Sequence, residues 1–163
     1  MKYCGKCGAE IADEAVVCTK CGCSVQKCEA PAIKLKTNRG LLKYILLSII
    51  TLGIYTLVVM SKISTEINVV ASKYDGKKTM HFLVAFLLLG GITLGIVPLV
   101  WSHKLCNRIG GELNRRGIDY SFSASTFWLW GVLGVLIIVG PFIYTAKLLK
   151  SMNYINADYN EKG

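Results

Sequence analysis

Ile50-Thr51-Leu52-Gly53-Ile54 recurs 42 residues later as Ile92-Thr93-Leu94-Gly95-Ile96 in this chain of 163 residues. A degraded third copy, Ile138-Val139-Gly140-Pro141-Phe142, follows 45 residues further on, counted from glycine to glycine. Each copy comes after a nearly all-apolar stretch and before a segment that begins apolar and becomes amphipathic. A nearly constant period predicts three copies of one supersecondary unit, over residues 39–76, 79–117 and 121–160.

The glycine in each copy is expected to interrupt a helix. Pro98 and Pro141 come shortly after the second and third glycines, and proline suits the first turn of a helix. Apolar residues beyond each glycine recur every three or four positions, as on one face of a helix. Each unit is therefore predicted to be a helix, a break at Gly53, Gly95 or Gly140, and a second helix.

Long uncharged runs coincide with the three units: Tyr44–Ser61, Phe82–Ser102 and Tyr120–Ala146. Only 18% of the residues are charged, below the ~25% of an average soluble protein. Apolar runs of this length are candidates for membrane helices. The sequence therefore predicts a multi-pass protein of the cell membrane, with an all-α membrane domain of three quasi-repeated broken helices over 39–160.

Two membrane topologies fit these runs. In one, each unit crosses once as a kinked helix and continues along the surface; in the other, each unit is a re-entrant hairpin that returns to the same side. Loop charges show no alternation from side to side, which favours hairpins. The first two runs have 18 and 21 uncharged residues, which matches the hydrocarbon core and favours crossings. We expect three crossings, with hairpins as the alternative.

The net charge of +9 is concentrated beside the apolar runs. Cations in such positions predict contact with anionic membrane lipids. Three tryptophans lie near the ends of the apolar segments, as interfacial anchors do. They are Trp101, Trp128 and Trp130.

Residues 1–23 carry a metal-binding pattern of two Cys-x-x-Cys pairs, each followed by glycine. The four cysteines are Cys4, Cys7, Cys18 and Cys21. Zinc takes four cysteine sulfurs in a closed tetrahedral site, which is structural because no position remains for water. So short a segment cannot bury enough core to fold alone, so zinc binding must supply the free energy. We predict a small zinc ribbon with a β-hairpin, holding one Zn²⁺, and a linker over residues 24–38.

The ribbon is expected to face the cytosol. No signal peptide precedes the first apolar run, and a reducing compartment keeps the thiolates free for zinc. Disulfide bonds are the alternative use of these cysteines. Cys23 and Cys28 depart from the ribbon pattern, and their role, like that of Cys106, stays open.

Two families resemble parts of the chain. Residues 1–23 resemble a short bacterial zinc-ribbon family found at the N-terminus of many otherwise unrelated membrane proteins. Thr51-Leu52-Gly53-Ile54-Tyr55 resembles the motif of a bacterial membrane domain of unknown function, which would cover about residues 39–160. That family has a tryptophan several residues after the motif, where this chain has Met60. Gly95–Ser102 is also similar to the intramembrane helix of interferon-induced transmembrane proteins, which supports a re-entrant arrangement. These resemblances imply no chemistry.

An enzyme is not expected, because the sequence has no nucleophile–base pair, phosphate loop or carboxylate pair. The absence of charge within the apolar runs argues against a coupled transporter. His103 and Cys106 are too few for a metal site, and the acidic residues of the ribbon argue against nucleic acid. We expect a membrane adaptor whose ribbon docks a protein partner and whose helical domain forms homo-oligomers. A membrane-shaping protein that uses amphipathic helices and a small oligomeric channel are the alternatives.

Overall fold

A computed structural model describes residues 2–3, 10–12, 19–20 and 33–162 of the chain. The chain divides into two units, Met1–Ile33 and Lys34–Gly163. In the first unit, β1 (Lys2–Tyr3) pairs antiparallel with β2 (Glu10–Ile11), so that Lys2 is opposite Ile11 and Tyr3 is opposite Glu10. The four predicted zinc ligands lie outside the described residues.

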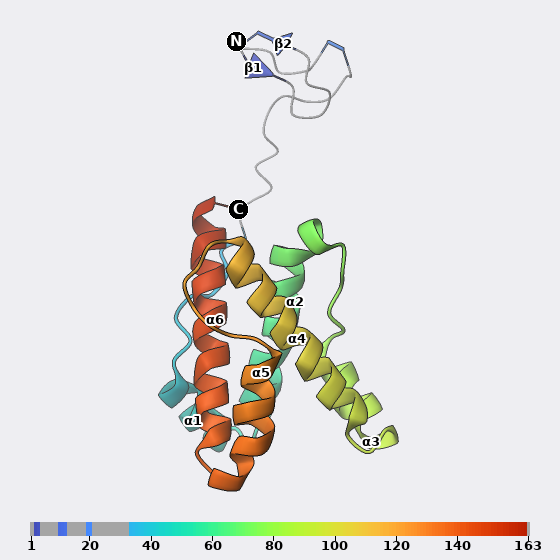
Figure 1. Ribbon diagram of the computed structural model, residues 1–163, viewed down its shortest axis with the longest axis vertical. Helices are drawn as coiled ribbons and strands as arrows, with labels where there is room; N and C mark the ends of the chain where they lie inside the picture. The colour runs from blue at the N-terminus through green and yellow to red at the C-terminus, as the bar shows by residue number, and fades with distance from the viewer. Residues whose placement is uncertain (1, 4–9, 13–18, 21–32, 163) are drawn as a thin grey trace. The chain divides into compact units, whose positions relative to one another are not determined.

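The second unit, here called the helical domain, is built from three successive pairs of helical segments (Figure 1). The first pair is α1 (Leu41–Ile50) and α2 (Ile54–Asp75). The second is a π-helical turn η1 (Val84–Leu88) with α3 (Leu89–Ile92), followed by α4 (Ile96–Arg115). The third is α5 (Ala124–Thr126), η2 (Phe127–Val132) and η3 (Leu133–Ile137), followed by α6 (Gly140–Lys162).

Each pair is a hairpin, because the chain reverses between its two halves. Across the first turn, the hydroxyls of Ser48 and Thr56 lie 2.9 Å apart. Across the second, the ring of Phe86 packs on Trp101 with 5.5 Å between centroids. The breaks are therefore reversals of the chain and not kinks in continuous helices, and the number of membrane crossings stays a prediction. The ten residues of α1 span about 15 Å, half the thickness of a bilayer's hydrocarbon core.

The first two turns have the same backbone geometry. Leu52 and Leu94 have φ of 49° and 50°, and the glycines that follow, Gly53 and Gly95, have φ of 90° and 86°. Glycine adopts such angles freely, whereas leucine does so at a cost. This succession of left-handed residues reverses the chain within the motif that the sequence repeats.

A threonine hydroxyl holds each of these two turns closed. Thr51 donates to the carbonyl of Leu47 at 2.7 Å and accepts the N–H of Tyr55 at 2.9 Å. Thr93 makes the equivalent bonds in the second turn, at 2.7 and 3.2 Å. The hydroxyl thus links the end of one helix to the start of the next.

The third turn is closed in another way. Its left-handed residue is Ile138, with φ of 57°, and Gly140 already belongs to α6. A Cβ atom on Gly140 would lie 2.3 Å from the Cα of Gly134. Gly140 therefore allows two backbones to touch, and the sequence difference between the third copy and the first two has a structural counterpart.

The core of the helical domain lies between α2, α4 and α6, which contact one another pairwise. Its central side chains come from the apolar stripes that the sequence predicts for the second helix of each unit. The most deeply buried members are Ile63, Ile67, Val70, Leu105, Ile109, Leu113, Leu148, Met152 and Ile155. These stripes are used for packing inside the protein, so they are not free to lie on a bilayer as amphipathic surface helices.

The helical domain begins before residue 39, where the sequence places its start. Asn160 binds both backbone groups of Leu35, each at 2.8 Å. Asn153 binds both backbone groups of Arg39, at 3.0 and 2.8 Å. The predicted linker over 24–38 is therefore too long, because its last residues are fixed to α6 by asparagine side chains.

Gly110 and Gly111 in α4 provide a matched test of the packing. A Cβ atom on Gly110 would lie 2.2 Å from the carbonyl oxygen of Phe122, whereas one on Gly111 would meet nothing within 4 Å. We expect Gly110→Ala to destabilise the domain by about 1–3 kcal/mol through overpacking. Gly111→Ala should stabilise it by up to about 1 kcal/mol, because alanine is the better helix former. Unfolding of both purified variants in detergent measures this, and equal stabilities would contradict the packing.

Candidate functional site

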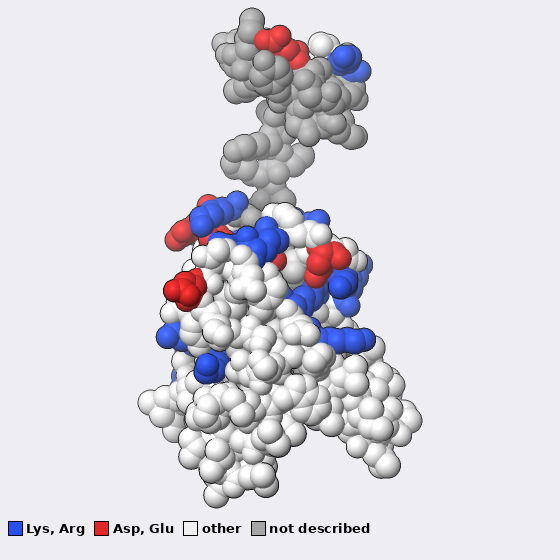
Figure 2. All heavy atoms as spheres, viewed as in Figure 1, with Lys and Arg blue, Asp and Glu red and all other residues white. Residues whose placement is uncertain are grey.

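One end of the helical domain exposes apolar side chains and carries no charge (Figure 2). The tips of the hairpins are the most exposed part of it: Leu52 is 94% exposed, Leu94 93% and Leu136 87%. Monomeric soluble proteins rarely expose a large contiguous apolar surface. This apolar end, defined by the three turns and the residues beside them, is the first candidate functional surface.

Helix α2 is the one helix of the described residues that is long and apolar enough to cross a membrane. Only its first part, residues 54–61, is free of charge. In its second half Glu66 is buried and pairs with Arg39 at 2.5 Å. The apolar part of α2 therefore belongs to the apolar end, and its charged part to the opposite end of the domain.

Lysines border the apolar end at similar distances from the turns. Lys62 and Lys104 each lie nine positions after the glycine of their turn, and Lys147 lies seven positions after Gly140. At 1.5 Å per helical residue, these separations correspond to about 10–14 Å. With Lys43 on α1, these residues form what we call the lysine girdle: Lys43, Lys62, Lys104 and Lys147.

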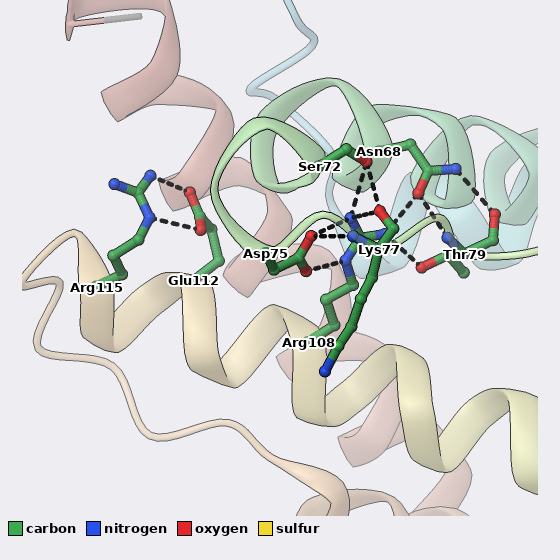
Figure 3. Close-up of polar contacts among 8 residues, drawn as sticks. All are labelled: Asn68, Ser72, Asp75, Lys77, Thr79, Arg108, Glu112 and Arg115. Atoms are coloured by element: carbon green, nitrogen blue, oxygen red, sulfur yellow. Dashed lines mark hydrogen bonds and ion pairs between the residues drawn. The ribbon is translucent and has the colours of Figure 1, made fainter.

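Beyond the girdle, Arg108 joins α4 to the end of α2 and to the segment that follows it (Figure 3). Its guanidinium donates to both carboxylate oxygens of Asp75, at 2.7 and 3.1 Å, and to Asn68 Oδ1 at 2.5 Å. Its other acceptors are Ser72, Lys77 O and Thr79. The planar guanidinium suits such a set of fixed acceptors, which an ammonium group could not satisfy.

Glu112 is a second junction, on the same helix. It accepts hydrogen bonds from Arg115 at 2.5 and 2.9 Å and from Arg116 at 2.7 Å. Burial acts to raise the pKa of Glu112, but these hydrogen bonds and charges outweigh it and lower the pKa below its usual range. Arg116 also reaches Asp158 on α6, at 2.5 Å. The carboxylate is therefore ionised and ties α4 to α6 through Arg116.

A buried polar cluster lies where α2, α6 and the first residues of the domain meet. Asn156 donates to Glu66 at 2.8 Å and to the carbonyl of Lys36 at 2.8 Å. Glu66 also pairs with Arg39, and its charge is thereby compensated. Asn153, Asn156 and Asn160 lie along one face of α6, and together they bind the extended chain of residues 35–39.

A groove of about 1150 Å³ runs along α4. At one end its lining is apolar, with Met80, Val97 and Val100. At the other it is cationic, and there Arg108 and Arg115 are paired with Asp75 and Glu112. Three lysines line the groove without an ion pair to any residue in 33–162: Lys77, Lys78 and Lys104. The groove therefore passes from an apolar to a positively charged environment.

The predicted interfacial tryptophans have different surroundings. Trp101 is only 6% exposed and donates to the carbonyl of Met80 at 2.7 Å. It is therefore part of the core and cannot anchor the protein at an interface. Trp128 is 42% exposed and donates to His103 at 3.0 Å, and Trp130 is half-buried.

His103 and Cys106 have different partners in the structure. His103 bonds with Trp128, whereas Cys106 is fully buried and lies 3.3 Å from the hydroxyl of Tyr144. Within the described parts of the chain, no three histidine, cysteine or acidic side chains are grouped as metal ligands. Cys23 and Cys28 lie outside those parts.

Two family models match the chain. Residues 3–25 match a zinc-ribbon domain, and residues 39–111 match a domain of unknown function, DUF4234. The chain therefore carries an N-terminal zinc ribbon followed by this domain, as the resemblances at both segments predict, and the ribbon supports zinc binding. Comparison with curated proteins gave no match, and neither did comparison with solved structures.

The polar junctions of the helical domain were not predicted from the sequence. Arg108 and Glu66 have no sequence motif, because their partners are 27 to 90 residues away. Glu112 had a local signal, since Arg115 and Arg116 follow it by three and four residues on the same helical face. The sequence did carry a usable signal for one row of polar residues. The spacing of three and four residues between Asn153, Asn156 and Asn160 places three amides on one helical face. Such a row predicts hydrogen bonding to a neighbouring segment.

Arg108→Lys should destabilise the helical domain, because lysine cannot replace the fork of donors and leaves the part-buried acceptors on Asn68, Ser72 and Thr79 without their donor. We expect a loss of about 1–3 kcal/mol, the usual cost of leaving polar groups without their hydrogen-bond partners. Lys104→Arg, one helical turn earlier on an exposed site, is the control and should change stability by less than about 0.5 kcal/mol. Thermal unfolding in detergent compares the two variants, and an unchanged Arg108→Lys protein would contradict the assigned network.

Proposed function

We propose that this protein is a membrane-anchored adaptor. Its three hairpins insert their tips into one leaflet of the cell membrane, the lysine girdle lies at the anionic headgroups, and the zinc ribbon docks a protein partner in the cytosol. The observation that carries the proposal is the uncharged, exposed apolar end formed by the three turns. In this arrangement the three units act as copies of one inserting element.

The hydrogen bonding of the turns supports a place in lipid. Backbone groups in the hydrocarbon core must be satisfied within the protein, since no water is present. The Thr51 hydroxyl serves one carbonyl and one N–H group, and the N–H of Gly53 reaches the carbonyl of Ser48 at 2.7 Å. The second turn repeats these bonds. Unsatisfied backbone groups in lipid are the main physical objection to a re-entrant hairpin, and the bonds within these turns remove it.

The position of the lysines supports insertion to about half the depth of the bilayer. They border an apolar end about 10–14 Å deep, and one leaflet contributes about 15 Å of hydrocarbon. Juxtamembrane lysines are each worth about 1 kcal/mol of attraction to an anionic surface. Their similar distances from the three turns also favour a membrane over a protein partner as the cover of the apolar end, because a partner has no reason to end at a similar distance from all three turns.

Single-cysteine labelling tests the insertion. Lys78→Cys, Asn114→Cys and Glu161→Cys place thiols on exposed positions of the charged end, and Leu52→Cys places one at a tip, all in a Cys106→Ser background. With an impermeant thiol reagent, intact cells should label none of the four. After lysis, with membranes kept intact, the three charged-end thiols should label and the Leu52→Cys thiol should stay protected.

Peptide-resolved mass spectrometry separates the introduced thiols from those of the ribbon. Labelling of any charged-end position in intact cells would overturn the one-sided arrangement. Free labelling of Leu52→Cys in sealed membranes would overturn the insertion of the tips. Leu52→Asp combined with Leu94→Asp should release the protein from the membrane fraction, with Asn114→Asp as the matched control at the other end.

The ribbon is tested by its metal. One zinc ion per chain is expected in the purified full-length protein, and Cys18→Ser should abolish it while leaving the helicity of the domain unchanged. The same variant should lose partner docking if the protein is an adaptor. A protein that shapes membranes by inserting wedges into one leaflet would keep its effect on vesicle curvature. A full zinc content in Cys18→Ser would contradict the assigned ligands.

A further inference from the structure

We infer that the groove along α4 binds one molecule of anionic phospholipid, with the phosphate at Lys78 and Lys104 and an acyl chain along Val97 and Val100. This inference rests on the proposed insertion and adds to it a specific lipid site. General attraction of the protein to a charged membrane surface would need only the lysine girdle, whereas the groove provides a binding site for a single lipid molecule.

The charges in the groove fit an anionic headgroup. Its two carboxylates, Asp75 and Glu112, are already paired with arginines at 2.5 to 3.1 Å. In Figure 3 the ammonium of Lys77 lies apart from the Arg108 network, joined to none of the residues drawn. Together with Lys78 and Lys104, the Lys77 ammonium gives the groove a surplus of positive charge. A phosphate would neutralise this charge through charge-assisted hydrogen bonds.

The shape of the groove fits an amphipathic ligand better than a free phosphate. It follows α4 from Val97 to Arg115, a rise of about 27 Å. The proposed phosphate position at Lys104 lies about 10 Å along α4 from Val97, so an acyl chain would continue past Val97 onto the apolar end of the domain. The apolar end of the groove is continuous with the apolar end of the domain, because Val100 is 47% exposed and the neighbouring Leu99 and Ile96 are 42% and 64% exposed. A free phosphate would need no such extension.

Gly111 keeps the charged end of the groove open. It lines the groove, and an added Cβ atom would meet nothing within 4 Å. A side chain here starts in open space, extends into the groove and also favours the helix. This position therefore separates ligand binding from folding.

The test measures lipid retained by the full-length protein. Wild type, Gly111→Leu and Asn114→Leu are purified from nanodiscs of equal parts phosphatidylglycerol and phosphatidylcholine, and bound lipids are counted by native mass spectrometry. Asn114 is exposed on α4 but does not line the groove. We expect one retained phosphatidylglycerol on wild type and Asn114→Leu, and about tenfold weaker retention on Gly111→Leu.

Lys78→Gln with Lys104→Gln provides an independent arm and should also lose the retained lipid, whereas Lys150→Gln, outside the groove, should keep it. Equal retention of phosphatidylglycerol by wild type and Gly111→Leu would overturn the site. Retention of phosphatidylcholine by wild type equal to that of phosphatidylglycerol would also overturn it. Displacement of the lipid by inorganic phosphate at millimolar concentration would show that the headgroup alone is bound and overturn the lipid assignment. All variants should still float with vesicles; a wild type that does not float would instead overturn the proposed insertion.

Discussion

A threonine hydroxyl, placed one residue before a left-handed leucine, closes each of the first two turns, and the arrangement of the helical domain depends on it. Thr51 and Thr93 each accept an N–H from the returning helix and donate to a carbonyl of the helix before. The bonds offset the strain of a leucine at positive φ. Because both turns reverse the chain in the same way, the amphipathic halves of α2 and α4 run back together and can bury their apolar stripes with α6.

The arginines and the lysines of the helical domain have different surroundings. Arg39, Arg108 and Arg116 have side chains no more than 9% exposed, and each makes an ion pair with a carboxylate. Lysines such as Lys62 and Lys104 stay exposed. A guanidinium satisfies several fixed acceptors at once, whereas an ammonium on a flexible chain is better kept in a polar environment. The arginines therefore hold helices together, and the lysines are left to contact whatever surrounds the domain.

The sequence predicted the helical segments and the stripes that form the core, because both follow from helical periodicity. It left the direction of the chain beyond each break open between a kinked helix and a hairpin, and the structure has the hairpin. The lengths of the apolar runs match a bilayer, and nothing in a length distinguishes one crossing from a hairpin of two half-length helices. Trp101 lies near a segment end, as an interfacial anchor would, yet it is buried because Phe82 and Phe86 cover it. The contacts of Glu66 with Asn156, and of Arg108 with Asn68, join residues far apart in sequence, and only the assembled fold brings them together.

The lack of charge at the three tips has a consequence for biogenesis. A polytopic protein must carry its polar loops through the bilayer, which is slow without a translocation channel. In the proposed arrangement, hairpins that stop halfway would move only uncharged residues into lipid, and every lysine and arginine of the helical domain would stay on the side where the chain is made. Insertion could then follow folding of the core, with the finished domain entering the leaflet as one body. The order of assembly would be the reverse of that of a helical bundle, in which insertion of each helix precedes packing.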